Sequence, residues 1–268
     1  MLLRWALPQL GLRWEGFRRV RRQVCRRIGR RIAELGLVDA AAYRRQLEGH
    51  REEWGVLETF CRIPISRFYR DRGVFEGLRG VVLPALVQRA EARADGRLRA
   101  WSAGCASGEE AWTLLACFAS DVAPRHPALR LELVATDVDA RLLERARRAR
   151  YAPSSVRELP AELHALLFVA RDGALAVQER HRDAITWWLQ DLRHEAPEGL
   201  FDLVLCRNVV FTYFDADEQG RALARIAGRL RPGGALVIGR HERLPEDAAG
   251  FAAWPGAPCV YQHGAAAS

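Results

Sequence analysis

The spacing of apolar residues changes near Leu98, and this change divides the chain. From there on, short apolar runs alternate with stretches in which apolar residues recur every three or four positions. The runs predict strands at 98–103, 129–136, 184–189, 200–206 and 234–239. The periodic stretches predict helices at 109–120, 139–150 and 216–230. Such alternation predicts an α/β fold with a mostly parallel sheet and helices on both faces, and residues 259–263 predict a final antiparallel edge strand.

Upstream of Leu98 the pattern is helical. Helices are predicted at 14–35, 40–47 and 51–61, with Asp39 as the N-cap of the second. We therefore expect a small all-α domain at 1–72, a connecting helix and loop at 73–97, and the sheet domain at 98–268.

Positive charge is concentrated in the predicted N-terminal domain. Residues 1–72 hold 17 arginines and 8 acidic residues, a net charge of +9, whereas the other 24 arginines and 25 acidic residues nearly cancel. The arginines of the 14–35 helix form either a solvated face or a surface for an acidic protein partner. Nucleic acid is the least favoured partner, because no aromatic residues alternate with these arginines.

Cysteine usage and hydropathy indicate a cytoplasmic protein without a metal. The six cysteines form no Cys-x-x-Cys pair and have no histidines at metal-ligand spacing, so we expect reduced thiols. No apolar run reaches the ~18 residues that predict a membrane span. The first residues are interrupted by Arg4 and Pro8 and do not predict a signal peptide.

The loop between the first strand and its helix is the strongest candidate for chemistry. Residues 102–110 read Ser-Ala-Gly-Cys-Ala-Ser-Gly-Glu-Glu, and glycines there allow a backbone to approach a ligand. Asp137 follows the next strand, the position from which an acidic residue binds a ribose. The chain has no lysine and no phosphate-binding loop, which favours S-adenosylmethionine over a nucleotide. The alternative is an ordinary turn between a strand and a helix.

Several stretches together resemble one family, the chemotaxis receptor methyltransferases of the CheR type. These enzymes use S-adenosylmethionine to methylate glutamate carboxylates on chemoreceptors. The resemblance rests on the loop at 102–110 and on Ser-Arg-Phe-Tyr-Arg-Asp (66–71), Ala-Thr-Asp-Val-Asp (135–139), Phe-Asp-Leu-Val-Leu-Cys-Arg-Asn-Val (201–209) and Leu-Arg-Pro-Gly-Gly (230–234). It implies a Rossmann-like class I methyltransferase fold and a small helical N-terminal domain with a basic helix that faces the cleft.

The resemblance also assigns roles to individual residues. Ser66 and Arg70 would reach the methionine end of the cofactor and the transfer site. The rest of the pocket would consist of Gly104 and Glu109 around the methionyl group, Asp137 on the ribose, Asp191 and Leu192 at the adenine, and Asn208 and Val209 as the floor. Tyr213 would be the active-site tyrosine.

The chain departs from the family pattern near the acceptor side. Pro64 replaces an asparagine, and Gly-Arg-His-Glu at 239–242 replaces Gly-His-Ser-Glu. The segment 209–214 is one residue longer than in the family, so either Thr212 or Tyr213 matches its tyrosine. Residues 244–258 are too few for the extra sheet with which some members hold a receptor tail, so we expect no such sheet there.

The expected chemistry needs little from the protein beyond orientation. A glutamate carboxylate, with a pKa of ~4.3, is ionised at neutral pH and needs no general base. Arg70 suits such an anion as a forked donor, and Tyr213 adds a hydroxyl. The alternative roles are a surface ion pair of Arg70 with Asp71 or Glu76, and a core position for Tyr213 beside Phe211 and Phe214.

Two other functions stay open at this point. A small-molecule O- or N-methyltransferase would need a group that takes up a proton, for which His241 is the candidate. A non-catalytic adaptor would bind the cofactor and use the basic helix to dock a partner. The sequence leaves the identity of the acceptor and the oligomeric state open.

Overall fold

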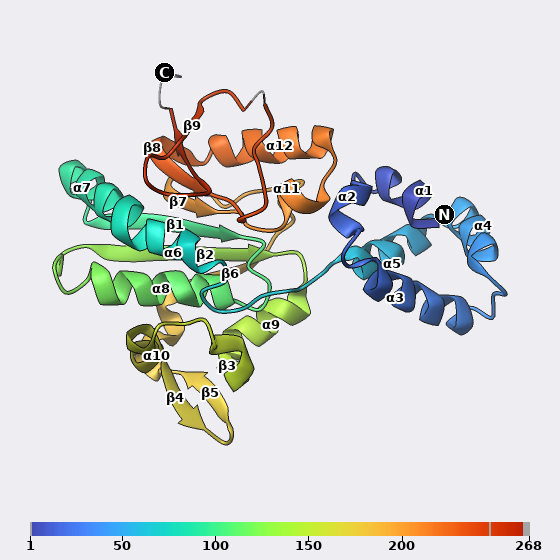
Figure 1. The fold of residues 1–268 in the computed structure, drawn as a ribbon, viewed down its shortest axis with the longest axis horizontal. Coiled ribbons are helices and arrows are strands. Elements are labelled where there is room, and N and C mark those ends of the chain that lie inside the picture. Colours follow the sequence, from blue (N-terminus) through green and yellow to red (C-terminus); the bar gives the residue numbers. More distant parts are fainter. Residues whose placement is uncertain (1, 247, 265–268) are drawn as a thin grey trace. The chain divides into compact units, whose positions relative to one another are not determined.

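The computed structural model describes residues 2–246 and 248–264, which form two compact units (Figure 1). The smaller unit comprises the chain up to Pro64 together with Thr212–Gln219. The larger unit comprises Ile65–Phe211 and the chain from Gly220 onward. The units thus divide after Pro64, whereas the sequence analysis placed a boundary at residue 72, and the motif at 66–71 belongs to the larger unit.

Helices build the N-terminal part of the smaller unit. They are α1 (Leu2–Gln9), α2 (Trp14–Phe17), α3 (Arg21–Glu34), α4 (Ala40–Gly49) and α5 (Arg51–Cys61). α1 was not predicted, although Leu3, Ala6 and Leu7 bury one face of it.

The prediction of one helix over 14–35 was wrong, because the chain turns between α2 and α3. α2 is fixed to the segment 212–214: a Cβ atom on Gly16 would collide with the Thr212 carbonyl oxygen, and the Arg13 amide donates to the Tyr213 carbonyl (2.9 Å). α3 instead buries Val24 and Ile28. The turn lets α2 pack against residues 212–214 while α3 buries a different face.

A seven-stranded, mostly parallel sheet forms the centre of the larger unit, as predicted. Its order is β6-β2-β1-β7-β8-β10-β9. The strands are β1 (Arg97–Ala103), β2 (Arg130–Asp137), β6 (Ile185–Leu189), β7 (Phe201–Leu205), β8 (Leu230–Val237), β9 (Phe251–Ala253) and β10 (Val260–His263). β10 pairs antiparallel with β8 and with β9, and the short β9, which was not predicted, takes the edge position.

The remaining helices are α6 (Arg72–Gly77), a π-helical turn (Leu78–Val82), α7 (Leu83–Arg93), α8 (Glu109–Asp121), α9 (Ala140–Arg148), α10 (Ala161–Leu167), α11 (Val210–Tyr213) and α12 (Ala216–Ala227), with 3-10 turns at Pro153–Val156 and Glu179–Ala184.

The direction of winding reverses between β1 and β7. The chain passes from β1 through α8 to β2 in one direction, and from β7 through α12 to β8 in the other. Right-handed crossovers therefore place α8 and α12 on opposite faces, and ligands bind such sheets where the winding reverses.

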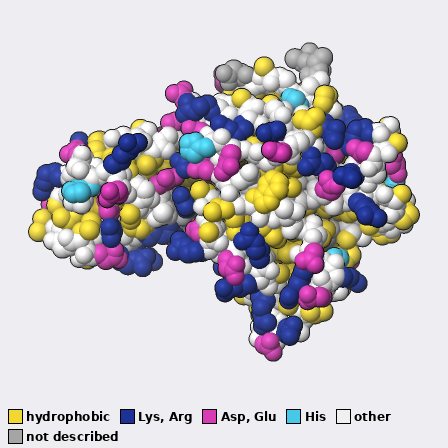
Figure 2. Space-filling view, turned by 180° about the vertical axis from the view of Figure 1, so that it is seen from behind, with side chains coloured by type: hydrophobic (Ala, Val, Ile, Leu, Met, Phe, Trp, Pro, Cys, Tyr) yellow, Lys and Arg dark blue, Asp and Glu magenta, His cyan; other side chains and the backbone are white. Residues whose placement is uncertain are grey.

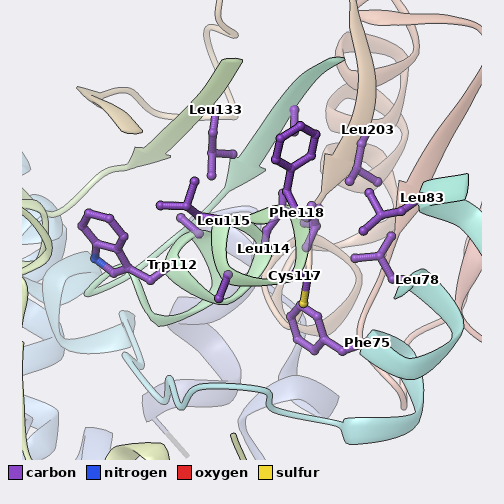
Figure 3. Packing of buried hydrophobic residues seen from close by; sticks show 14 of the residues in the cluster. Phe75, Leu78, Leu83, Trp112, Leu114, Leu115, Cys117, Phe118, Leu133 and Leu203 are labelled. Carbon is purple, nitrogen blue, oxygen red and sulfur yellow. The ribbon is translucent and has the colours of Figure 1, made fainter. Parts of the chain in front are cut away.

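Helix α8 lies in the centre of the hydrophobic core. Apolar side chains all along it are buried, because helices cover it on the side that faces away from the sheet. Figure 3 shows the ring of Phe75 beside Cys117, and Leu78 and Leu83 close to Leu203 of β7. The helix that begins at the candidate loop is consequently fixed by packing on all sides.

A second, antiparallel sheet stands apart from the main one (Figure 1). It consists of β3 (Arg150–Tyr151), β5 (Ala174–Val177) and β4 (Phe168–Arg171). No extra sheet was expected at 244–258, and the one present occupies a stretch in which the sequence analysis placed no strand. Its strands are too short for an alternating pattern, and the tight turn at Asp172 and Gly173, both with positive φ, joins two of them.

Within the residues that the structure describes, no helix is both long and apolar enough to cross a membrane.

A buried carboxylate in the smaller unit gives a testable link between pH and stability. Glu53 is 5% exposed and accepts hydrogen bonds from Arg31 Nε (3.0 Å), Arg31 Nη2 (2.8 Å) and the Tyr43 hydroxyl (2.7 Å). The hydrogen bond from Arg31 lowers the pKa of Glu53, although burial opposes this shift. The ionised form therefore stabilises the folded unit above the ordinary pKa of a glutamate, and this contribution is lost as the pH falls through the lowered value.

We predict that Glu53→Gln lowers the free energy of unfolding by about 1–2 kcal/mol at neutral pH, because charged hydrogen bonds are lost. The difference from wild type should shrink as the pH falls below ~4. Urea unfolding at several pH values measures both effects. Glu52→Gln is the matched control, since Glu52 lies on the same helical turn but is exposed. Equal stability losses in the two variants would contradict the prediction.

Candidate functional site

The loop after β1 is bonded to the end of β2. The amides of Gly104 and Cys105 both donate to the Thr136 carbonyl, at 2.8 and 2.9 Å. The next amide, of Ala106, donates to Asp137 Oδ2 (2.8 Å). Three consecutive backbone groups thus fix the loop against the strand that ends in Asp137.

Two glycines in this loop have no room for a side chain. Gly104 has φ +74°, and a Cβ atom there would lie 2.7 Å from Val209 Cγ2. Gly108 has φ +90°, and a Cβ atom there would lie 2.8 Å from the ring of Trp187. The first contact brings together two residues that the sequence assigned to one pocket, Gly104 and Val209.

A buried carboxylate begins α8 directly after the loop. Glu109 is 2% exposed, and the Ser107 hydroxyl lies 2.9 Å from each of its oxygens. The Tyr151 hydroxyl donates to the Ser107 carbonyl (2.7 Å). Glu109 is therefore held at the helix N-terminus, where free amides stabilise negative charge.

Its neighbour Glu110 belongs to a network that the sequence analysis did not identify. It accepts from the Ser102 hydroxyl (2.8 Å) and from Arg207 Nη1 (3.1 Å). Burial raises the pKa of Glu110 above its ordinary value, against the opposing effect of Arg207. Arg207 belongs to the Cys-Arg-Asn-Val motif. The motif therefore indicated this part of the chain, but it did not indicate that Arg207 pairs with Glu110.

Glu242 connects the ends of β7 and β8. Its Oε2 accepts from the amides of Asn208 (2.8 Å) and Gly239 (2.6 Å), and the residue is buried. Asn208 has φ +59°, a backbone conformation that asparagine tolerates better than most residues. Glu242 thus fixes the predicted pocket floor, another role that the sequence analysis missed.

The segment after β6 lies against the end of β2. The Gln190 amide donates to the Asp137 carbonyl (3.1 Å), which places Asp191 next to the predicted ribose-binding position. Asp191 Oδ2 lies 2.5 Å from Arg193 Nη2. Burial alone would raise the pKa of Asp191, but the hydrogen bonds from Arg193 lower it overall. Leu192 is buried, and its carbonyl accepts from Arg225 Nη1 (2.8 Å).

Arg70 lies in the turn that precedes α6, four residues after the half-buried Ser66. Its Nη1 donates to the Ile65 carbonyl (2.6 Å). The expected alternative, an ion pair with Asp71 or Glu76, is not formed. Glu76 pairs with Arg72 (2.6 Å), and Asp71 pairs with Arg207 (2.9 Å).

Tyr213 is the one predicted site residue outside the larger unit. Its ring lies against Phe17, with ring centroids 5.0 Å apart and an interplanar angle of 53°. The carbonyl of Thr212 accepts from Arg13 Nε (3.0 Å). The segment that is one residue longer than in the family is therefore hydrogen-bonded to Arg13, the residue directly before α2.

The carboxyl end of the sheet fits a nucleoside cofactor. The backbone is bare at Gly104, where a Cβ atom would strike Val209, and the adjacent strand β2 ends in the Asp137 carboxylate, which accepts from the amides of Ala106 and Asp139. The described residues contain no group of three or more histidine, cysteine, aspartate or glutamate side chains that could hold a metal ion.

Comparison with known proteins gives a family for this arrangement. Residues 65–257 match the family model described as CheR methyltransferase, SAM binding domain. An uncharacterized 104.1 kDa protein of Rhodobacter capsulatus is 35% identical over 223 residues, which cover 82% of this chain and 23% of that protein. A chemotaxis protein methyltransferase of Listeria monocytogenes is 34% identical over 186 residues, which cover 69% of this chain and 68% of that protein.

A chemotaxis protein methyltransferase of Escherichia coli is 29% identical over 232 residues, which cover 84% of this chain and 77% of that protein. These findings confirm the resemblance inferred from the motifs, and with it S-adenosylmethionine as the cofactor. The chain belongs to the CheR methyltransferase family and is an S-adenosylmethionine-dependent methyltransferase.

Proposed function

We propose that this protein methylates glutamate carboxylates of a chemoreceptor-like protein. The observation that carries the proposal is the state of Arg70. Among the described residues no carboxylate lies within ion-pair distance of its guanidinium, because Asp71 and Glu76 pair elsewhere. An arginine without a carboxylate partner suits an acceptor that is itself a carboxylate. The names of the curated relatives from Listeria monocytogenes and Escherichia coli support the same acceptor class.

The chemistry asks this chain for orientation. When bound, S-adenosylmethionine supplies a methyl group on a sulfonium, which an ionised carboxylate attacks without a general base. Arg70 holds that carboxylate in line, and Ser66 lies at the methionine end of the pocket. Tyr213 adds a hydroxyl to the acceptor side.

The remaining predicted residues hold the cofactor. Asp137 binds the ribose hydroxyls, and Asp191 with Leu192 borders the adenine; the hydrogen bond from Gln190 to Asp137 supports this arrangement because it keeps the two segments adjacent. The other assigned positions are Gly104 and Glu109 at the methionyl group, and Asn208 and Val209 at the floor.

We expect α3 to contact an acidic surface of the protein substrate. Arg21, Arg22, Arg26 and Arg30 are exposed and form no ion pair among the described residues. Figure 2 shows basic side chains on both units, with acidic ones among them. What marks α3 is that four such arginines lie on one helix. The additional sheet of β3, β5 and β4 offers a further surface to which a receptor tail would bind. The six cysteines are free thiols, which supports the cytoplasm as the location.

Transfer of label from methyl-labelled S-adenosylmethionine tests the acceptor. We expect label in a chemoreceptor cytoplasmic fragment as an alkali-labile ester, and none when its glutamates are replaced by glutamines or alanines. Label found only in small molecules would favour a small-molecule acceptor, with the exposed His241 as the group that takes up the proton. Cofactor binding without transfer to any acceptor would favour the adaptor.

We predict that Arg70→Ala lowers kcat by about 10²-fold, because the acceptor carboxylate is no longer held in line with the methyl group. The Kd for S-adenosylhomocysteine should rise by a smaller factor than kcat falls, because Arg70 reaches both the methionine end of the cofactor and the acceptor. Arg72→Ala is the control, because Arg72 is exposed and pairs only with exposed Glu76. A wild-type kcat for Arg70→Ala would refute the assigned role.

For the cofactor pocket we predict that Asp137→Ala weakens S-adenosylhomocysteine binding on the order of 30–100-fold, which corresponds to about 2–3 kcal/mol of charged hydrogen bonding. Asp139→Asn is the matched control, because Asp139 caps α9 and asparagine caps as well. Calorimetric titration measures both variants. Similar Kd values for wild type and Asp137→Ala would show that Asp137 does not bind the cofactor.

A further inference from the structure

Arg70 sits in a turn with an unfavourable backbone. The residues on either side of it, Tyr69 and Asp71, have φ angles of +57° and +61°. Residues other than glycine rarely adopt this left-handed conformation, and a tyrosine, which is bulky, adopts it least readily of the two. Such a turn persists only if its surroundings hold it.

The first half of the turn is held by backbone bonds and packing. The Tyr69 amide donates to Thr113 Oγ1 of α8 (3.2 Å), and the Phe68 amide donates to the Ser155 carbonyl (3.1 Å). The ring of Tyr69 is buried and stacks on Phe75, with centroids 5.2 Å apart. These contacts fix the chain up to Tyr69 but none of them reaches Arg70 itself.

In the second half, the Val74 amide donates to the Asp71 carbonyl (2.8 Å), and the side chain of Arg207 joins the turn to α8. Its Nη2 donates to the Arg70 carbonyl (2.7 Å) and to Asp71 Oδ2 (2.9 Å). Its Nη1 donates to Glu110 Oε2 on α8 (3.1 Å), and its guanidinium carbon lies 5.0 Å from the ring centroid of Phe75. The side chain is only 3% exposed, so these groups are its environment.

We propose that Arg207 is the positioning residue of Arg70: it holds the left-handed turn in the shape that presents the Arg70 side chain to the acceptor. This inference rests on the proposed role of Arg70 in methyl transfer. Arg207 directly precedes Asn208, so the same short segment also forms the predicted floor of the cofactor pocket. Arg207 therefore fixes the acceptor-binding arginine relative to the bound cofactor.

The fork of a guanidinium is necessary for this arrangement. Arg207 meets a carbonyl and two carboxylates, which lie on different segments of the chain. A lysine keeps the positive charge beside Glu110 and Asp71, but its ammonium is a compact charge without the planar fork. Arg207→Lys consequently separates the geometry from the charge.

A double-mutant cycle tests the inference. We expect Arg207→Lys to lower kcat with a receptor fragment on the order of tenfold, while the Kd for S-adenosylhomocysteine rises by a smaller factor. In the Arg70→Ala background the same substitution should cause no further loss of kcat, because there is no longer a side chain to position. Asp71→Ala, which removes one of the two bonds to the turn at a partly exposed residue, should show the same pattern with a smaller loss.

Arg93→Lys is the matched control for stability. Arg93 pairs with the buried carboxylate of Asp202 (2.9 Å), and Asp202 lies near the amino end of β7, whereas Arg207 lies just beyond its carboxyl end. We expect a lower Tm for this variant with an unchanged kcat. If Arg93→Lys loses kcat as much as Arg207→Lys at a matched loss of Tm, Arg207 acts only through stability and the inference is wrong.

The cycle also separates this inference from the proposed function. If Arg70→Ala keeps the wild-type kcat, the role of Arg70 fails, and the positioning role fails with it. If Arg70→Ala loses activity but Arg207→Lys multiplies that loss, the proposed function stands and only the positioning role is overturned. An unchanged kcat in both Arg207→Lys and Asp71→Ala has the same meaning.

Discussion

The carbonyl of Thr136 is the point on which the site of this protein depends. It accepts two consecutive amides, from Gly104 and Cys105, at the place where β1 and β2 end side by side. This pair of bonds directs the loop across the end of β2, so that the next amide meets Asp137. The bare backbone at Gly104, the carboxylate of Asp137 and the start of α8 thereby come to lie at one edge of the sheet.

Charged side chains buried near this edge give it a defined shape. Arg207 joins the turn of Arg70 to α8, and Glu242 joins the ends of β7 and β8. Buried ion pairs contribute little net stability, because desolvation offsets much of their attraction. Their hydrogen bonds are directional, however, so they select one arrangement of the loops around them. In this protein the loops so arranged carry most of the residues assigned to the cofactor and the acceptor.

The main sheet could be predicted because its strands and helices alternate with clear periods. The loop at 102–110 and Asp137 could be placed at the ends of β1 and β2 because their positions follow from that alternation. The network of Arg207, Glu110 and Asp71 could not, since its members are far apart in the chain and only the folded sheet brings them together. The short strands β3, β5 and β4 carry too few residues for any periodic signal. The turn between α2 and α3 depends on packing against residues 212–214, which no local pattern reveals.

The central claim is that the carboxyl edge between β1, β2 and β7 is the cofactor site. A crystal structure of the protein with S-adenosylhomocysteine tests it most directly. The account predicts the ribose hydroxyls on the Asp137 carboxylate, the adenine beside Asp191 and Leu192, and the homocysteine along Gly104 toward Glu109. A ligand bound at another edge of the sheet, or with its ribose away from Asp137, would contradict it.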